Sequence, residues 1–108
     1  MKQKLTIKSQ ADLDLAGHYV YLLGKNPEAA ARLREAVKAA YKRIRKDPRS
    51  CATLVGPEFE HLELRFCHPR GFASYSIIFQ VTDECPAVLR VLHASQDVVT
   101  AIRGGGTS

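Results

Sequence analysis

The sequence lacks the features of a membrane or exported protein. None of its apolar runs approaches the roughly 20 residues that a membrane-spanning helix requires. The first residues, Met1-Lys2-Gln3-Lys4, lead into only a few apolar positions, which is too little for the apolar core of a signal peptide. On these grounds the sequence predicts a protein that stays in the cytoplasm.

Cysteine is scarce as well. The three cysteines, Cys51, Cys67 and Cys85, are widely spaced and form no Cys-x-x-Cys pair, and the four histidines complete no zinc-binding pattern. His68 follows Cys67 directly, but neighbouring residues of a strand point to opposite faces and make a poor chelate. We therefore expect free thiols in a reducing compartment, no metal site and no cofactor.

What the sequence does contain is enough for one compact domain. It has 108 residues, of which 45% are hydrophobic and 25% charged, a balance typical of a globular protein with a modest core. We expect a single domain over residues 1–103. Residues 104–108 are expected to form a flexible tail, because this segment begins with three glycines.

The chain is basic. Its formal net charge of +5 attracts nucleic acid, ribosomes or an acidic protein partner without choosing among them. Many of the cations gather in one stretch, namely Arg32, Arg34, Lys38, Lys42, Arg43, Arg45, Lys46 and Arg49. This stretch is either the solvated face of a helix or a functional surface, and charge alone does not decide between the two.

Two amphipathic helices are expected in the first half. Residues 5–8 alternate apolar and polar side chains and predict a short strand, after which Ser9 is placed to cap a helix. In that helix we expect one apolar stripe to face inward, made of Leu13, Ala16, Tyr19, Val20, Leu22 and Leu23. A second helix over residues 27–46 has apolar residues at three- and four-residue steps and a basic opposite face. The connection between the two helices is short, which predicts that they form an antiparallel hairpin.

The second half changes to the period of β-strands. Three strands are expected, over residues 61–66, 72–81 and 88–93, with Leu62, Leu64 and Phe66 of the first pointing inward. Strands joined by such short links pair antiparallel. Residues 97–102 are expected to form a last turn of helix. The fold class is therefore α+β in the order β-α-α-β-β-β, with a helical hairpin covering one face of a small, mostly antiparallel sheet.

This order of elements resembles the RelE/ParE superfamily of bacterial toxins. Residues 26–30, Asn-Pro-Glu-Ala-Ala, lie between the helices as is common in such toxins, and residues 71–81, GFASYSIIFQV, are similar to a family segment of the form "gf..y.i.y.v". Residues 90–98, RVLHASQDV, look like the ending "RVLHgxRD" of the ParE branch. One position departs from the pattern, because Gln96 stands where the family usually has arginine.

The resemblance implies the toxin of a type II toxin–antitoxin module, in the ParE branch, which inhibits DNA gyrase by binding and not by catalysis. Its partners would be gyrase and a cognate antitoxin, the latter in a hetero-oligomer. The RelE branch implies the alternative, a ribosome-dependent mRNA endonuclease acting on the ribosome. A further alternative is an inactive toxin relic that only binds the antitoxin.

The residues themselves favour binding over catalysis. RNA cleavage through the 2′-hydroxyl needs a base, an acid and cations that hold the phosphate. Residues 51–64 contain no lysine or arginine, and no tyrosine follows Tyr75, so the set that a nuclease needs is incomplete. If the chain is an enzyme, the candidates for catalysis are His93, Arg65 and Arg90.

A wider set of residues is expected to contact the target: Arg65, Arg70, Arg90, His93, Gln96 and Asp97. Some of these residues can have structural roles instead. His93 can hydrogen-bond the turn that follows it, and the arginines can pair with Glu60, Glu63 or Asp97. An exposed sheet edge, or a groove beside the helical hairpin, would suit a strand or an amphipathic helix of an acidic antitoxin.

Overall fold

The computed structural model describes residues 4–104 of the chain. The elements, in chain order, are β1 (Thr6–Ile7), α1 (Ser9–Lys25), α2 (Pro27–Lys46), the 3-10 turn η1 (Pro48–Ser50), β2 (Ala52–Thr53), the 3-10 turn η2 (Pro57–Phe59), β3 (Leu64–Cys67), β4 (Tyr75–Gln80), β5 (Ala87–His93) and α3 (Val98–Gly104). The expected tail lies outside the described residues except for Gly104, which ends α3.

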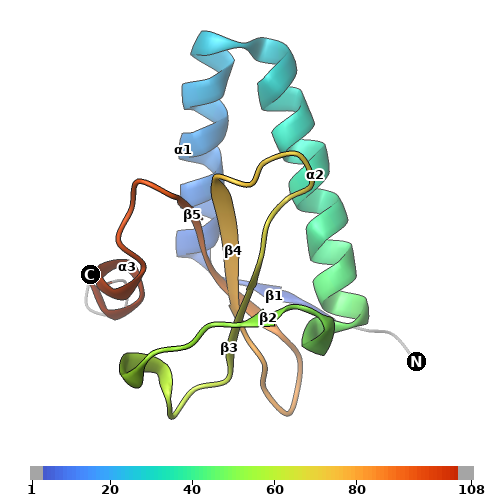
Figure 1. The fold of residues 1–108 in the computed structure, drawn as a ribbon. Coiled ribbons are helices and arrows are strands. Elements are labelled where there is room, and N and C mark those ends of the chain that lie inside the picture. Colours follow the sequence, from blue (N-terminus) through green and yellow to red (C-terminus); the bar gives the residue numbers. More distant parts are fainter. Residues whose placement is uncertain (1–3, 105–108) are drawn as a thin grey trace.

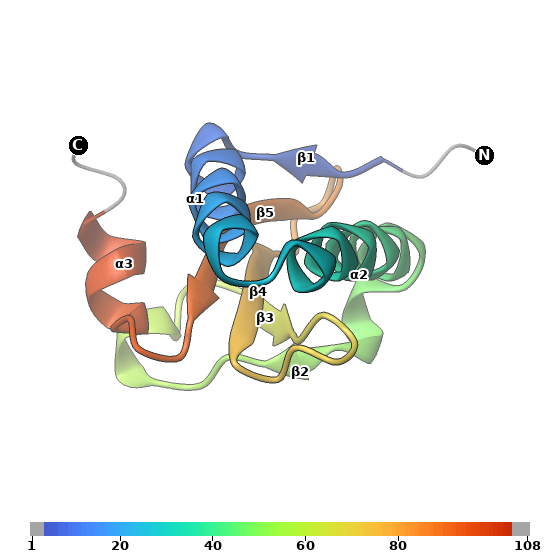
Figure 2. The same cartoon turned by 90° about the horizontal axis from the view of Figure 1, so that it is seen from above.

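One five-stranded sheet carries the fold, in the order β1-β5-β4-β3-β2. The pair β1–β5 is parallel and the other pairs are antiparallel. The hairpin of α1 and α2 covers one face of this sheet, and α3 lies beyond the β5 edge (Figures 1 and 2). The α+β class is therefore confirmed, with β2 as an additional strand.

Helix α2 follows the sequence prediction over its whole length. Asn26 caps it, because the Asn26 side-chain oxygen accepts hydrogen bonds from the backbone N–H groups of Glu28 (3.1 Å) and Ala29 (3.2 Å). Its buried positions recur at steps of three and four residues, at Ala30, Leu33, Val37, Ala40 and Ile44. The basic residues occupy the opposite, exposed face.

Helix α1 differs from its prediction in two ways. Ser9 is the first helical residue and not the cap, and the capping position, Lys8, makes no side-chain capping bond. The expected inward stripe is only partly correct, because Leu22 packs on the core but Leu13 and Val20 are 64% and 66% exposed. Beside Leu22, the face against the sheet contains Ala11 and Leu15. Apolar residues therefore lie on two sides of α1, and only one of these sides faces the sheet.

Both faces of the central strands are buried. Cross-strand partners share a face, so the register places Cys67, Ile77 and Val91 together on the face toward the helices, where all three belong to the main core. The expected inward residue Leu64 is fully buried, but it lies on the face away from the hairpin. Side chains alternate between the two faces along a strand, so Leu64 and Cys67, three residues apart in β3, point to opposite faces. Phe66 and Leu62 are only partly buried.

The cap of α2 can be tested directly. Replacing Asn26 with alanine is expected to lower the free energy of unfolding by about 1 kcal/mol, because two N–H groups of the first turn lose their acceptor. Urea denaturation followed by circular dichroism measures this change. Ser9→Ala is the matched control and should stay within about 0.5 kcal/mol of the parent, since Ser9 caps nothing. Equal losses in the two variants would contradict the assignment.

Candidate functional site

A buried ion pair joins α1 to β5. The Arg90 guanidinium donates two hydrogen bonds to the Asp14 carboxylate, from Nε to Oδ2 at 2.7 Å and from Nη2 to Oδ1 at 2.9 Å. The side chains are only 14% and 8% exposed. The hydrogen bonds from Arg90 to Asp14 raise the pKa of Arg90 above its ordinary value. Arg90 is therefore charged, and in the structure it is paired with Asp14.

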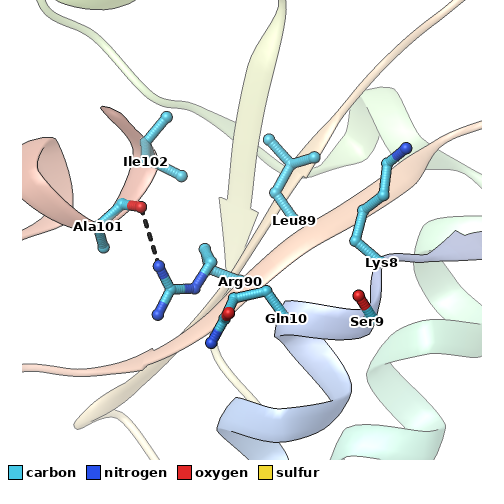
Figure 3. A pocket seen from close by; sticks show the side chains of 7 residues that line it. All are labelled: Lys8, Ser9, Gln10, Leu89, Arg90, Ala101 and Ile102. Atoms are coloured by element: carbon cyan, nitrogen blue, oxygen red, sulfur yellow. Dashed lines mark hydrogen bonds between the residues drawn. The ribbon is translucent and has the colours of Figure 1, made fainter. Parts of the chain in front are cut away.

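The same arginine reaches the C-terminal helix. Its Nη1 donates to the carbonyl oxygen of Ala101 at 2.9 Å, and Figure 3 shows the guanidinium extending from β5 to α3. Around it lies a pocket of about 310 Å³, which is also lined by Lys8, Ser9, Gln10, Leu89 and Ile102. Arg90 forms part of the wall of this pocket, with three of its five N–H donors engaged by Asp14 and Ala101.

Side chains of α1 close the outer edge of β5. β1 pairs only with Ala87 and Val88, so the next outward-facing backbone groups are those of Val91. The Val91 N–H donates to Asp14 Oδ2 at 3.0 Å, and the Val91 carbonyl accepts from Nε2 of His18 at 2.9 Å. Further along, the His93 N–H donates to the side-chain oxygen of Gln96 at 2.8 Å. This edge is therefore not free to bind another strand at these positions.

Two histidines and two tyrosines meet at the end of β5. A pocket of about 330 Å³ is lined by His18, Tyr21, Tyr75, His93, Ser95 and Gln96. The Tyr75 ring contacts the rings of His18 and His93 edge to face, each with centroids 5.0 Å apart. Burial raises the pKa of Tyr75, and the nearby Tyr21 adds to the rise, so the Tyr75 hydroxyl stays protonated at neutral pH.

The hydrogen bonds of His93 fix which ring nitrogen carries its proton. The Ser95 backbone N–H donates to His93 Nδ1 at 3.1 Å, so neutral His93 carries its hydrogen on Nε2. The pocket thus presents groups able to give and take protons, but no lysine or arginine lines it. A site that cleaves RNA would also need a cation to hold the phosphate, and the lining of this pocket supplies neither lysine nor arginine.

Arg65 lies at the other end of the sheet. Its Nε donates to Oε2 of Glu63 at 3.2 Å and its Nη1 to the carbonyl oxygen of Cys51 at 2.7 Å. Arg49 binds the same carboxylate, with both hydrogen bonds at 3.1 Å. The hydrogen bonds from Arg49, and to a smaller degree the one from Arg65, hold the pKa of the Glu63 carboxyl below its usual value. The pairing with Glu63 was among the alternatives that the sequence left open.

The remaining candidates lie in two further environments. Arg70 is exposed on the loop between β3 and β4 and makes no ion pair with any residue that the structure describes. It borders a groove of about 550 Å³ beside α2, with Arg32 and Phe72 among the lining residues. Asp97 caps α3, since its carboxylate accepts from the Val99 N–H (3.2 Å) and the Thr100 hydroxyl (2.6 Å).

The predicted residues thus do not form one site. His93 and Gln96 line the pocket at the end of β5, Arg90 lines a separate pocket between β5 and α3, and Asp97 caps α3. Arg65 and Arg70 lie apart from these residues. Sequence reasoning missed Asp14, His18 and Tyr75, which hold or line this region. The available signal was the spacing of Asp14 and His18, which stand four residues apart on one side of a helix.

Within residues 4–104, no three histidine, cysteine or acidic side chains come together as a metal site would require. No helix in the same range is long and apolar enough to span a bilayer.

The helical hairpin over a small, mostly antiparallel sheet is a fold that occurs in another solved structure. A chain of the solved structure titled "Chromosomal ParDE TA system from P. aeruginosa" has this fold, with a TM-score of 0.68, 18% sequence identity, and alignment over 84% of the present chain and 95% of that chain. A family model, ParE toxin of type II toxin-antitoxin system, parDE, matches residues 5–98. The protein belongs to this ParE toxin family. A comparison with curated proteins found no match.

The Asp14–Arg90 pair yields a stability prediction. Asp14→Ala is expected to lower the free energy of unfolding by about 3 kcal/mol, because it leaves a mostly buried guanidinium without its carboxylate and the Val91 N–H without its acceptor. Chemical denaturation of both proteins measures the difference. Glu35→Ala is the control, since it removes an exposed pair with Lys38 and should cost no more than about 0.5 kcal/mol. A loss for Asp14→Ala as small as that of the control would contradict the role given to this pair.

Proposed function

We propose that this ParE-family toxin inhibits DNA gyrase by binding it, and that a cognate antitoxin holds it inactive. It would act in the cytoplasm, where gyrase works on DNA. The family membership supports a toxin with an antitoxin partner. The choice of gyrase over the ribosome rests on how the arginines of the sheet are used.

The observation that carries the proposal is the engagement of Arg65 and Arg90. A nuclease of this architecture needs cations directed at a scissile phosphate. Here Arg90 is held by Asp14 and Ala101, and Arg65 is held by Glu63 and the Cys51 carbonyl. Freeing Arg90 would leave the Asp14 carboxylate without the guanidinium, at a cost of a few kcal/mol, and freeing Arg65 would remove the side-chain donor of the Cys51 carbonyl. This arrangement supports a protein that recognises a surface.

One observation favours the alternative of mRNA cleavage. The pocket at the end of β5 contains His93, Tyr75 and His18, which are able to transfer protons. If the translating ribosome supplied the missing cationic environment, His93 would be the group to act on the 2′-hydroxyl. The alternative therefore makes a distinct prediction about His93.

The first experiment separates the two targets. The toxin, freed of its antitoxin, is added to gyrase with relaxed plasmid and, in parallel, to ribosomes translating a defined mRNA. We expect supercoiling to be inhibited, with accumulation of linear DNA in the gyrase reaction and intact mRNA in the other. Cleaved mRNA with unaffected gyrase would overturn the proposal.

Two variants sharpen this experiment. His93→Ala would abolish cleavage if the protein were a nuclease, whereas in a gyrase-binding toxin it removes one contact among several and should weaken inhibition only several-fold. Arg70→Ala should weaken gyrase inhibition several-fold without changing the fold, because this exposed side chain forms no ion pair within the described chain. Inactivity in both reactions, with antitoxin binding retained, would identify a toxin relic.

The helical hairpin of this chain offers a surface that suits an antitoxin. The outer stripe of α1, which we define as Leu13, Ala16, Gly17, Val20, Leu23 and Gly24, is exposed and has no charged side chain. Such a patch on a small protein marks an interaction site. The Arg34 guanidinium lies 5.2 Å from the Tyr19 ring and brings the basic face of α2 to the border of this stripe. We propose that an amphipathic antitoxin helix with an apolar face and acidic flank docks here.

This docking site is tested by placing charge in the stripe. Val20→Glu, and separately Leu13→Glu, should weaken antitoxin binding at least ten-fold, because each places a carboxylate in an apolar interface. Isothermal titration calorimetry measures the affinity. Val55→Glu is the matched control, since Val55 is 86% exposed in the segment between β2 and η2 and should leave the affinity unchanged. Unchanged affinity in both α1 variants would refute this placement of the antitoxin.

A further inference from the structure

Two of the three cysteines face each other across the β2–β3 pair. The register of this pair aligns Ala52 with Phe66 and Thr53 with Arg65, so one step before β2 aligns Cys51 with Cys67. The backbone of Cys51 is extended, with φ −88° and ψ 159°, and so continues the strand conformation. Both thiols are free and buried, at 5% and 7% exposure, and both belong to the core under the helices.

The hydrogen-bond pattern identifies the type of pair. The Leu54 N–H donates to the Leu64 carbonyl at 2.8 Å, which makes Leu54 and Leu64 a hydrogen-bonded pair. Pair types alternate along an antiparallel ladder, so Cys51 and Cys67 form a non-hydrogen-bonded pair, in which the Cα atoms are typically about 4.5 Å apart. That separation lies inside the range that a disulfide spans, whose Cα atoms are about 4.4–6.8 Å apart.

The two thiols also influence each other. Burial raises the pKa of Cys67 to about 12, with a smaller contribution from the Cys51 thiol. While β2 is paired with β3, Cys67 therefore stays a thiol and reacts slowly. Reaction therefore requires β2 to detach from β3 for a moment. Such opening is easy at this place, because β2 has only two residues and pairs with a single neighbour at the sheet edge.

We propose that Cys51 and Cys67 are a disulfide-forming pair that small oxidised disulfides, such as oxidised glutathione, convert to an intramolecular cross-strand bond. The Cys51 thiolate attacks a glutathione sulfur, which forms a mixed disulfide and releases one glutathione thiol. The Cys67 thiolate then attacks the Cys51 sulfur, which closes the protein disulfide and releases the second glutathione thiol. Each released glutathione takes up one of the two protons that the cysteines lose. The reaction thus oxidises two protein thiols and reduces one glutathione disulfide.

The bond would fasten the edge of the sheet. It encloses residues 51–67, a loop that contains β2, η2 and the Arg65 side chain bonded to the Cys51 carbonyl. Cys67 also lines a groove of about 190 Å³ with Arg43 and Arg70, so the bond fixes one wall of a basic groove. Closing a loop of this length should raise the midpoint of thermal unfolding by on the order of 10 °C.

The test uses the full chain and oxidised glutathione. After incubation at pH 8, free thiols are alkylated and the intact mass and the tryptic peptides are determined without reductant. We expect a peptide pair joined through Cys51 and Cys67, a raised melting midpoint, and reversal of both by dithiothreitol. Cys85 is less buried and should carry a glutathione or remain alkylatable.

Matched variants decide what the result means. Cys85→Ser should still form the bond, whereas Cys51→Ser and Cys67→Ser should lose both the linked peptides and the shift in melting midpoint. Because both thiols are buried, oxidation is repeated in urea just below the unfolding transition, where β2 opens. If Cys51 and Cys67 remain unlinked there, or link only between molecules, the proposal is overturned.

Discussion

The Asp14 carboxylate is the point at which three elements of this protein are joined. It accepts two hydrogen bonds from Arg90 and one from the Val91 backbone, and Arg90 in turn binds the Ala101 carbonyl of α3. A charge pair so little exposed is tolerated only when its hydrogen-bonding groups are satisfied, because each ion loses its water. The position of α1 on the sheet, the closure of the β5 edge and the docking of α3 therefore depend on one another.

This pairing explains why apolar residues of α1 such as Leu13 and Val20 face solvent. Asp14 and His18 must face β5 to satisfy Val91, and the stripe beside them is the one that contains Ala11, Leu15 and Leu22. The outer stripe, with Leu13 and Val20, is then left exposed at a cost in solubility. An exposed stripe of apolar side chains conflicts with the usual hydropathy pattern, and such conflicts are expected where a surface binds a partner. The exposed stripe and the ordered edge of β5 are therefore two results of the same constraint.

The sequence was informative where one signal acted alone. Helix α2 has a single apolar stripe, a cap at Asn26 and a terminating Asp47-Pro48, so its bounds and buried face followed directly. The orientation of α1 did not, because it depends on a partner, Arg90, that is 76 residues distant from Asp14 in the chain. β2 is two residues long and shows no periodicity. The partners of Arg65 and Arg90 are set by tertiary packing, so the sequence named the arginines without showing that they are engaged.

Gln96 makes a hydrogen bond at the edge of β5 that an arginine at the same position could not make. The resemblance placed an arginine there, but an arginine has only donors and has no atom that can accept the His93 N–H. The Gln96 side chain supplies that acceptor at 2.8 Å and completes the closed edge that Asp14 and His18 begin. The same residue lines the pocket of His18, Tyr75 and His93 without adding charge to it. An arginine here would bring the missing cation to two histidines and a tyrosine, but it would open the edge of β5. The chain has the closed edge, and with it a pocket that can exchange protons yet lacks a charge to hold a phosphate.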